Sequence, residues 1–520
     1  MSVVGTDTPG IVWGSSPDTQ VDVAPQQQWR YLRITGAVAI GAQFVVTLAL
    51  SAFLFHRFHL IEDFGIFNQA WTQIGQGHLD PFNSIYGFPF YKSHFELIMW
   101  PLALMHLVYP QPVSLLWFQD LTAAGAEFVA FVWIIEHLEK HRVATRVALP
   151  IGGAALVAIL VNPLLWGTVV FDFHFESTAA LFAVLAARAF YRERFVWAWV
   201  WVGATLLCGD LPALYVVGIG VSALLAGRAT RYHGLALVAV GGAWLGLINV
   251  IGANLGSALS DYAYLAGRTE LPASGGMGLV VIGVLTHPGR VLHELRIRLH
   301  DIWVVVEPAG GIGIASAWGC GVPMVVLVTS ALNSSPNYIG SPFQNFALFP
   351  FMLFGTVTVL VWLAARLHGR WVLPAILGTV LFLLALVSGI TTSTTIVRTA
   401  IDTGASAAQA AELRTVLQRT PGDAEVAASL RVVGRFSGRQ FAYLLVPSTE
   451  AIPVNSPDVV VVVALTSGID SATPAEVAAT TAALRGRFDV KVLSSSNGVY
   501  AFRLSVPKGV SQIDLTGTGH

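Results

Sequence analysis

Long apolar segments alternate with short polar ones over the first three quarters of the chain. Because about 20 apolar residues are enough to cross a bilayer, this pattern predicts a bundle of transmembrane helices. The uncharged segments are 34–55, 147–171, 211–227, 371–397 and, apart from His233, 232–260. Residues 308–365 also carry no charged side chain. We therefore expect about nine to eleven crossings. The pattern defines their number least well between residues 252 and 342.

Two stretches do not fit a simple crossing. Residues 94–109, HFELIMWPLALMHLVY, are apolar but only 16 residues long, so we expect a re-entrant or partly inserted segment. Residues 1–28 are rich in Ser, Thr, Pro, Asp and Gln and lack the charged and apolar regions of a signal peptide. This composition predicts a disordered N-terminal tail.

The pattern changes after residue 397. Residues 398–520 hold 21 of the 59 Lys, Arg, Asp and Glu side chains, which favours a soluble domain over further membrane helices. AAQAAELRTVLQ and TPAEVAATTAALRGRF show helical patterns, whereas FAYLLVPS, DVVVVVAL, VKVLSS and VYAFRL show strand patterns, the last two joined by a Ser-Asn-Gly turn. We predict a transmembrane domain at 29–397 followed by a small α/β domain at 398–520.

Composition places the chain among multi-pass helical membrane proteins. Of its 520 residues, 54% are hydrophobic and only 11% are charged, with a mean hydropathy of +0.66, whereas soluble domains carry about 25% charged residues. The net charge of -1 gives no basis for nucleic-acid binding. The two cysteines, Cys208 and Cys320, lie in different apolar segments and form neither a disulfide framework nor a metal motif.

Basic residues predict which helix ends face the cytoplasm. They occur as Arg30 and Arg33 before the first span and as the clusters Lys140/Arg142/Arg146, Arg188/Arg192/Arg194, Arg228/Arg231 and Arg366/Arg370. The positive-inside rule places these clusters and the N-terminus in the cytoplasm of a plasma membrane. The first polar loop, at 56–93, and the C-terminal domain then lie outside the cytoplasm.

Polar and ionisable side chains gather on the predicted outer side. Burying such groups in lipid costs about 2.5–3.5 kcal/mol each, so we expect them to surround water, a metal ion or a polar ligand. The candidates are Glu62, Asp63 and Gln69 after the first span, Lys92 and His94 in YKSHFE, Asp172, His174 and Glu176 in FDFHFE, and Asp210 in CGDLP.

Each candidate also has a structural interpretation. Asp120 and Glu127 are seven residues apart in 113–136 and share one helix face, which favours interhelical partners. The structural alternatives for the other positions are a solvated loop for Glu62 and Asp63, interfacial anchors for Lys92 and His94, helix caps for Asp172 and Asp210, and an interface histidine for His174.

Several of these motifs together resemble a bacterial and archaeal family of predicted multi-pass membrane proteins of unknown function. The architecture of this family is similar to that of GT-C-type glycosyltransferases, which use lipid-phosphate-linked sugars. The matching stretches are EDFGIFNQAWTQIGQGH, SHFELIMWPLALMHLVYP, FDFHFESTAALFAVLA, GDLPALYVVGIGV, YAYLAG and TPGDAEVAASLRVVGRFSGRQFAYLLVPS followed by DVVVVVAL. The resemblance covers roughly residues 30–505, nearly the whole chain.

The resemblance implies roles for individual positions. Asp63 matches the acidic residue of the first outer loop, the usual catalytic base or metal-associated carboxylate of GT-C enzymes. His94 matches the family's histidine after that loop, and Asp172 and His174 match its Asp-Phe-His motif.

One motif departs from the family pattern. Asp210 matches the last residue of a Lys-Glu-Asp triplet, but Cys208 and Gly209 replace the Lys and Glu. If that lysine normally holds a lipid-linked phosphate, this protein has lost it. Three alternatives stay open: Lys92 substitutes for it, the donor has changed, or the activity is gone.

The chemistry of sugar transfer from a polyprenyl phosphate to a cell-envelope glycan or lipid acceptor fits this set of residues. The reaction needs a base for the acceptor hydroxyl, positive charge or a metal ion for the departing phosphate, and an apolar groove for the lipid. The predicted catalytic carboxylates are Asp63, Glu62 and Asp172, and the predicted substrate-binding residues are Lys92, His94, His174, Asp210 and Gln69. A divalent cation held by Asp63, Asp172 and His174 stays open, because the spacing is not diagnostic.

Two other function classes also stay open. A non-catalytic lipid-binding or assembly relative with a degenerate site would account for the changes at 208–209. A transporter would use Asp120, Glu127 and Asp210 as proton relays and broken helices such as 308–343. No inverted repeat is visible, and the acidic residues crowd one membrane face, so the pattern favours the enzyme.

Overall fold

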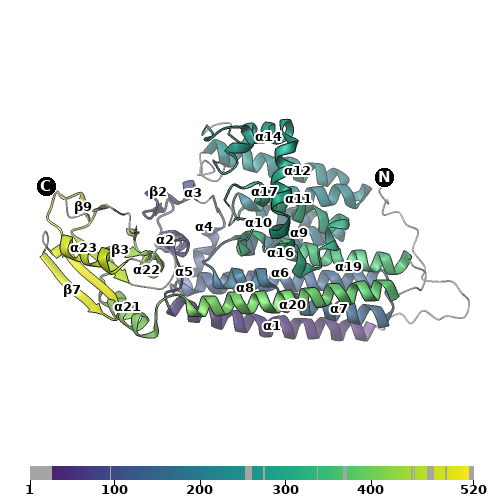
Figure 1. Ribbon diagram of the computed structural model, residues 1–520, viewed down its shortest axis with the longest axis horizontal. Helices are drawn as coiled ribbons and strands as arrows, with labels where there is room; N and C mark the ends of the chain where they lie inside the picture. The colour runs from purple at the N-terminus through teal and green to yellow at the C-terminus, as the bar shows by residue number, and fades with distance from the viewer. Residues whose placement is uncertain are drawn as a thin grey trace, which may run out of the picture.

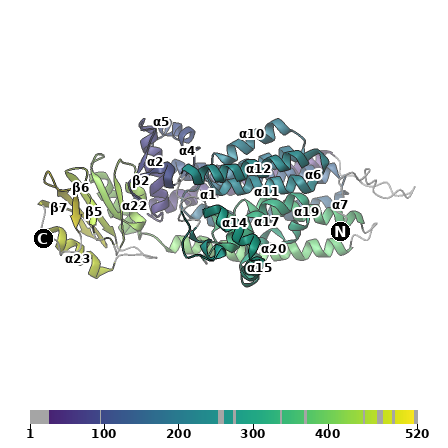
Figure 2. The same ribbon diagram turned by 90° about the horizontal axis from the view of Figure 1, so that it is seen from above.

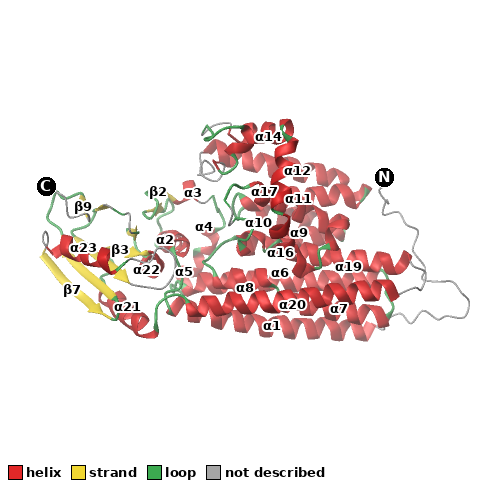
Figure 3. Ribbon diagram, viewed as in Figure 1, coloured by secondary structure: helices red, strands yellow, loops and turns green. Residues whose placement is uncertain are grey.

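The protein consists of a long helical bundle with a smaller α/β domain at one end (Figure 1). Figure 3 shows that the five-stranded sheet lies in this smaller domain, whereas the bundle is helical. The computed structural model describes residues 26–93, 95–251, 260–272, 276–335, 338–366, 372–446, 449, 451–464, 473–485 and 489–514. The predicted fold class, a multi-pass helical membrane protein with a C-terminal α/β domain, is confirmed.

Six helical segments of the described chain are long and apolar enough to cross a membrane. They are α1 (Gln26–His56), α6 (Val113–Lys140), Val147–Val170 in α7 (Thr145–Leu160) and α8 (Pro163–Val170), α12 (Arg228–Ile251), Pro342–Arg366 in α18 (Pro342–Asn345) and α19 (Leu348–Arg366), and Ile376–Asp402 in α20 (Val372–Asp402). Other helices of the bundle are α9 (Glu176–Tyr191), α10 (Phe195–Leu206), α11 (Leu211–Ala226), α14 (Gly276–Thr286), α15 (Pro288–Ile297), α16 (Leu299–Val306) and α17 (Ala317–Leu332), with the 3-10 turns η1 (Ala263–Ala266), η2 (Glu307–Ala309) and η3 (Ile312–Ala315). The number of crossings stays a prediction.

The bundle helices approach closely at small residues. A side chain at Gly218 of α11 or at Gly321 of α17 would collide with the backbone of the other helix. At the same crossing the Ser222 hydroxyl accepts a hydrogen bond from the Gly321 amide at 3.2 Å. Small residues and such interhelical hydrogen bonds replace the hydrophobic effect as the main attraction between helices in lipid.

Basic clusters lie at one end of the bundle. Arg33, near the start of α1, pairs with Glu139 near the end of α6. Lys140 lies 4.6 Å from the ring centroid of Tyr191, the last residue of α9. Because α1 is about 45 Å long at 1.5 Å per residue, its opposite end, which leads into the first polar segment, is far from these clusters.

The first polar segment, predicted as an outer loop at 56–93, contains regular elements. It folds into α2 (Glu62–Gly75), the two-residue strands β1 (Phe82–Asn83) and β2 (Phe88–Pro89), and α3 (Phe90–Ser93). The apolar stretch after it forms the short helices α4 (Met99–Leu102) and α5 (Leu104–Val108). On α5, the ring centroid of His106 lies 4.6 Å from that of Trp71 on α2. This broken geometry fits a partly inserted segment.

The C-terminal domain is a sheet covered on both faces. The sheet has the strand order β4-β3-β6-β8-β7, with β3 parallel to β4 and β6 and the remaining pairs antiparallel. Val460 and Val462 pack with α21 and α22, whereas Val459 and Val461 pack with α23, so both faces of β6 are buried. The elements are α21 (Ala407–Arg419), β3 (Glu425–Ser429), α22 (Leu430–Phe436), β4 (Ala442–Leu445), β5 (Ala451–Pro453), β6 (Asp458–Ala464), α23 (Pro474–Arg485), β7 (Asp489–Ser496), β8 (Val499–Ser505) and β9 (Gln512–Asp514).

Two boundaries differ from the prediction. The last long helix, α20, continues to Asp402, beyond the predicted domain boundary at 397. Three residues of the predicted N-terminal tail, 26–28, are the first turn of α1, and residues 1–25 lie outside the described residues. The hairpin of β7 and β8 is as predicted, since Asn497 and Gly498 both have positive φ, the geometry of a type I′ turn.

Helix α22 docks the C-terminal domain on the bundle. Arg431 and Arg435, one turn apart, donate hydrogen bonds to the His59 and Phe55 carbonyls at 2.7 and 2.8 Å. These carbonyls lie at or just beyond the C-terminus of α1, where the helix dipole favours positive charge. In the other direction, Phe58 is fully buried in the core of the C-terminal domain. The contacts fix this domain beside α2.

Candidate active site

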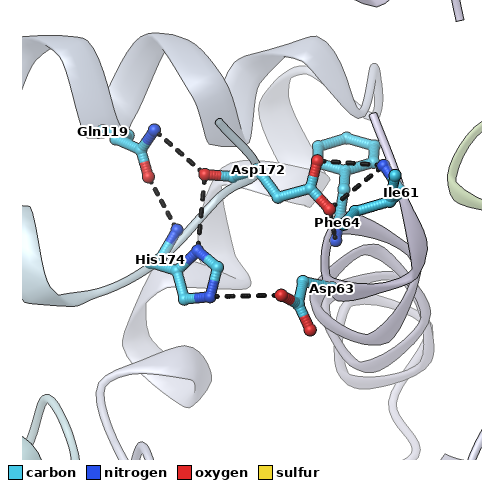
Figure 4. Close-up of polar contacts among 6 residues, drawn as sticks. All are labelled: Ile61, Asp63, Phe64, Gln119, Asp172 and His174. Carbon is cyan, nitrogen blue, oxygen red and sulfur yellow. Dashed lines mark hydrogen bonds and ion pairs between the residues drawn. The ribbon is translucent and has the colours of Figure 1, made fainter. Parts of the chain in front are cut away.

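Asp63 and His174 face one another at the end of the bundle that carries the C-terminal domain (Figure 4). Asp63 lies in the first turn of α2, and an oxygen of its carboxylate is 3.5 Å from Nε2 of His174. The His174 side chain is only 7% exposed, whereas that of Asp63 is 24% exposed. The pair therefore has a buried imidazole behind a carboxylate that solvent can reach.

Asp172 fixes the start of α2. Its carboxylate accepts hydrogen bonds from the backbone amides of Ile61, at 3.0 and 3.1 Å, and Phe64, at 3.0 Å. Helix α2 has no capping side chain of its own, so a residue more than 100 positions away caps it. Burial and the nearby Asp63 carboxylate raise the pKa of Asp172 to about 8, although the two amide hydrogen bonds oppose this shift.

Gln119 of α6 holds the segment that carries Asp172 and His174. Its amide nitrogen donates to the Thr168 and Asp172 carbonyls, at 3.1 and 3.3 Å, and its amide oxygen accepts from the His174 backbone amide at 2.6 Å. Nδ1 of His174 lies 3.4 Å from the Asp172 carbonyl. The imidazole also stacks on Phe343, with 3.8 Å between ring centroids. These contacts set the orientation of Nε2 toward Asp63.

Tyr86 also faces the carboxylates of α2. Burial, together with the charges of Asp63 and Glu62, raises the pKa of its hydroxyl, which keeps the phenol neutral and able to donate a hydrogen bond. The ring stacks on Phe88, and Tyr86 is 46% exposed. A neutral hydrogen-bond donor within electrostatic range of Asp63 is suited to orient a hydroxyl or phosphate group.

Gln69 has a structural position and not the predicted contact with substrate. It is fully buried, and its amide nitrogen donates to the Ser84 hydroxyl at 2.7 Å and to the Gln440 carbonyl at 2.9 Å. The Ser84 hydroxyl in turn donates to the Ala442 carbonyl of β4 at 2.6 Å. Gln69 therefore joins α2 to the C-terminal domain, because its polar atoms have no other way to be satisfied in a buried interface.

Among the described residues, Lys92 and Asp210 form no hydrogen bond or ion pair with the Asp63–His174 pair. Lys92 is exposed on α3, and His94 lies outside the described residues. Asp210 is the N-cap of α11 and accepts from the Leu211 amide at 2.8 Å, as the alternative interpretation expected. Glu62 lies beside Asp63 in the first turn of α2, and Glu176 begins α9.

Two of the three acidic residues proposed as proton relays lie deep in the bundle, whereas the third, Asp210, caps α11. Asp120 and Glu127 of α6 are buried. The Glu127 carboxylate accepts a hydrogen bond from the Asn162 side chain at 2.9 Å, and Asn162 itself caps α8. This interhelical partner fits a structural role for Glu127.

The described residues do not form a ready divalent-cation site. Among them, no three His, Cys, Asp or Glu side chains are grouped as metal ligands. Both oxygens of Asp172 accept backbone hydrogen bonds, so this carboxylate is already used, and Asp63 and His174 supply only two donors. The predicted three-ligand set does not fit a metal ion in this arrangement.

Several contributors to the site were absent from the sequence-based candidates. Gln119 directly precedes Asp120, one of the acidic residues considered from the sequence. The presence of a glutamine within an apolar helix could have identified Gln119 as a candidate. Nothing local marks His59, whose ring nitrogens lie 3.1 Å from the Val170 carbonyl and 3.1 Å from the Thr403 hydroxyl. Such contacts join segments more than 100 residues apart and depend on the fold.

Sequence comparison places the whole arrangement in a known family. The family described as "Predicted membrane protein (DUF2079)" matches residues 63–500. The chain belongs to this family. The match begins at Asp63 and ends in β8, so it includes the membrane bundle after α1 and most of the C-terminal domain. The predicted resemblance to a family of multi-pass membrane proteins is confirmed.

Individual proteins are less similar to the chain than the family pattern is. No curated protein matches the chain. Among solved structures, it is similar to ArnT from Cupriavidus metallidurans bound to undecaprenyl phosphate, with 11% identity over 92% of this chain and 98% of that chain and a TM-score of 0.49. The apo state of the same protein gives 12% identity, the same coverage and a TM-score of 0.39. No residue assignment rests on these two similarities.

Proposed function

We propose that this protein is an integral-membrane glycosyltransferase that moves a sugar from a polyprenyl-phosphate donor to an extracytoplasmic acceptor of the cell envelope. The observation that carries the proposal is the Asp63–His174 pair, a solvent-accessible carboxylate at the polar end of an apolar bundle. The family resemblance supports the same residue as the base. The basic clusters at the other end of the helices support an extracytoplasmic site by the positive-inside rule.

In the proposed mechanism, Asp63 takes the proton of the acceptor hydroxyl as that oxygen attacks C1 of the sugar. The bond from C1 to the phosphate oxygen breaks, and the lipid phosphate leaves with the electron pair. In the protonated imidazolium form of His174, Nδ1 donates to the Asp172 carbonyl and Nε2 donates to the Asp63 carboxylate, which orients this carboxylate toward the acceptor hydroxyl. Tyr86 is placed to donate a hydrogen bond beside Asp63.

The test replaces Asp63 by Asn and measures sugar transfer from radiolabelled polyprenyl-phosphate sugars in membranes. The swap keeps size and hydrogen bonding but removes the proton acceptor, so turnover should fall by about 10²–10⁴-fold. Asp80→Asn, an exposed carboxylate in the same polar segment, is the matched control and should keep wild-type turnover. Wild-type turnover in Asp63→Asn would rule out the base assignment.

Glu62 and Lys92 are tested in the same assay. Loss of turnover in Glu62→Gln with retention in Asp63→Asn would move the base to the neighbouring carboxylate. Lys92→Ala should weaken donor binding if the exposed ammonium meets the lipid phosphate. Unchanged donor affinity in Lys92→Ala would remove this residue from the site.

A non-catalytic lipid-binding protein is the second candidate, and Cys208 favours it. This residue stands where the resemblance expects a phosphate-binding lysine, and it is 1% exposed with its thiol 3.4 Å from the Ala204 carbonyl. A buried neutral thiol gives no charge to a phosphate. Binding of a polyprenyl phosphate without transfer of any sugar by the wild-type protein would favour this second candidate, and solute flux in proteoliposomes would favour a transporter.

A further inference from the structure

A cavity lies at the basic end of the bundle, away from the Asp63–His174 pair. Its volume is about 210 Å³, and it lies between α9 and α10 where the chain turns from one helix into the other. The lining residues are Leu185, Arg188, Ala189 and Arg192 on the α9 side, and Arg194, Trp197 and Trp201 on the α10 side.

The lining residues of each helix lie on one face of that helix, so each helix forms one wall of the cavity. On α9 they recur at three- and four-residue intervals, and on α10 they follow Arg194 by three and seven residues, so each set occupies a single helix face. Trp201 is held in place by stacking on Phe182, with 5.7 Å between ring centroids. The cavity therefore has an apolar, partly aromatic wall and a rim of three guanidinium groups.

The three arginines are not equally engaged within the protein. Arg188 binds both oxygens of Glu136, and Arg192 has one longer contact to the same carboxylate at 3.6 Å. Arg194 is exposed and has no ion pair among the described residues. The Glu136 carboxylate is thus shared by two of the three cations, and Arg194 adds a positive charge at the cavity rim that no ion pair among the described residues offsets. Glu193, in the turn, is not among the lining residues.

The outer side of α10 indicates what surrounds the cavity. Trp197 is 59% exposed, and Val196 and Val200 on the same helix are 78% and 50% exposed. Figure 2 places α10 at the edge of the bundle. Apolar residues that cover no protein on an outer helix of a membrane protein contact lipid tails, and tryptophans mark the level of the headgroups.

We infer that this cavity binds the phosphodiester headgroup of an anionic phospholipid. The guanidinium groups of Arg192 and Arg194 supply paired donors that match phosphate oxygens, and Trp197 and Trp201 cover the glycerol and upper acyl region. The apolar wall distinguishes a lipid from free phosphate, which would gain nothing from it. The site is at the opposite end of the bundle from the proposed glycosyl-transfer site and does not depend on that function.

The test measures the thermal unfolding midpoint of the purified full chain in detergent against increasing phosphatidylglycerol. A ligand that binds only the folded state raises this midpoint in a concentration-dependent way. We expect saturable stabilisation by phosphatidylglycerol and none by phosphatidylcholine or inorganic phosphate. Arg192→Gln/Arg194→Gln should weaken the apparent affinity about 30-fold. Arg228→Gln/Arg231→Gln removes the same charge at the same end outside the cavity and should keep wild-type affinity.

A second variant distinguishes a loss of lipid binding from a folding defect. Trp197→Ala changes a mostly exposed side chain, so the unliganded midpoint should stay near that of wild type while lipid affinity falls. Native mass spectrometry of the same samples should show one retained phosphatidylglycerol in wild type and its loss in both cavity variants. Equal stabilisation of wild type and Arg192→Gln/Arg194→Gln by phosphatidylglycerol would overturn the assignment of the cavity as the binding site. Stabilisation by inorganic phosphate equal to that by phosphatidylglycerol would show that the ligand is phosphate and not a lipid.

Discussion

Asp172 and Asp63 are both carboxylates of the same small region, but the chain uses them differently. Asp172 is 2% exposed, and both of its carboxylate oxygens accept hydrogen bonds from the backbone amides at the start of α2. The carboxylate of Asp63 instead faces His174 and is partly exposed to solvent. Asp172 is therefore a positioning residue. The sequence motifs singled out both residues but did not separate their roles, because capping across 108 residues leaves no local pattern.

Replacing Asp172 by Ala tests this positioning role. Loss of the cap and of the acceptors for two buried amides should lower stability by about 1–3 kcal/mol and reduce turnover through displacement of Asp63. Asp172→Asn, which keeps one acceptor, should recover part of both. Ser406→Ala, which removes the N-cap of α21, is the control and should reduce stability without reducing turnover of the remaining folded protein. Full activity in Asp172→Ala would contradict the assigned role.

At the level of elements, α2 depends on two domains at once. One side of the helix meets the bundle, and the other meets α22, where Gly65 and Gly434 lie close together. A side-chain carbon at Gly434 would come within 3.0 Å of the Ile61 carbonyl and 3.3 Å of the Phe64 ring. The crossing therefore needs a glycine for space, immediately beside the turn that carries Asp63.

Gly434→Val should separate α2 from α22 and cost about 1–3 kcal/mol. We expect a lower unfolding midpoint and increased proteolysis between the bundle and the C-terminal domain. Gly422→Ala is the control, because no atom lies within 4 Å of the added carbon. A Gly434→Val protein with wild-type stability and protease resistance would show that the crossing tolerates displacement.

Most elements follow from sequence, and most contacts at the site do not. The apolar segments, the helices α21 and α23, the strand β6 and the turn at Asn497 were predicted because period and turn chemistry are local. Helix α2, within the predicted outer loop 56–93, was not foreseen because it is stabilised by partners elsewhere, among them Asp172 and Gln440. Gln69 was assigned to substrate for the same reason, since a buried interdomain amide and a binding amide have the same sequence signature.

At the scale of the whole molecule, His59 joins three parts of the protein. Its Nε2 donates a hydrogen bond to the Val170 carbonyl at the end of α8, and its Nδ1 accepts one from the Thr403 hydroxyl after α20. The backbone carbonyl of His59 accepts from Arg431. Burial and the positive charge of Arg431 lower the pKa of His59 from 6.5 to about 4. The folded protein therefore holds this imidazole neutral.

The lowered pKa predicts an acid-sensitive connection. The contribution of neutral His59 is fully present above about pH 6.5 and is lost as pH falls toward about 4, because the unfolded chain binds a proton that the folded chain excludes. Over this window the unfolding midpoint of the detergent-solubilised protein should decline less in His59→Asn than in wild type. His78→Asn, at an exposed position, should keep the wild-type slope. Parallel curves for wild type and His59→Asn would contradict the prediction.

Orientation in the membrane is a second whole-molecule prediction. Gln512→Cys in the C-terminal domain and Arg142→Cys at the basic end both introduce exposed thiols. A membrane-impermeant maleimide should label Gln512→Cys in intact cells and Arg142→Cys only after permeabilisation, with the unaltered protein as background for Cys208 and Cys320. The reverse labelling would invert the topology and move the Asp63–His174 pair to the cytoplasmic side.

The contacts of Gln69 and Ser84 with residues 440 and 442 also bear on how the protein is made. Their partners are synthesised more than 350 residues later, which at about 5–20 residues per second leaves α2 without its second support for tens of seconds. During that time the bundle helices can insert while α2 is held from the bundle side, by Asp172, without its contacts to the C-terminal domain. A nascent chain released before β4 is therefore expected to be membrane-embedded but to lack the interdomain support of α2.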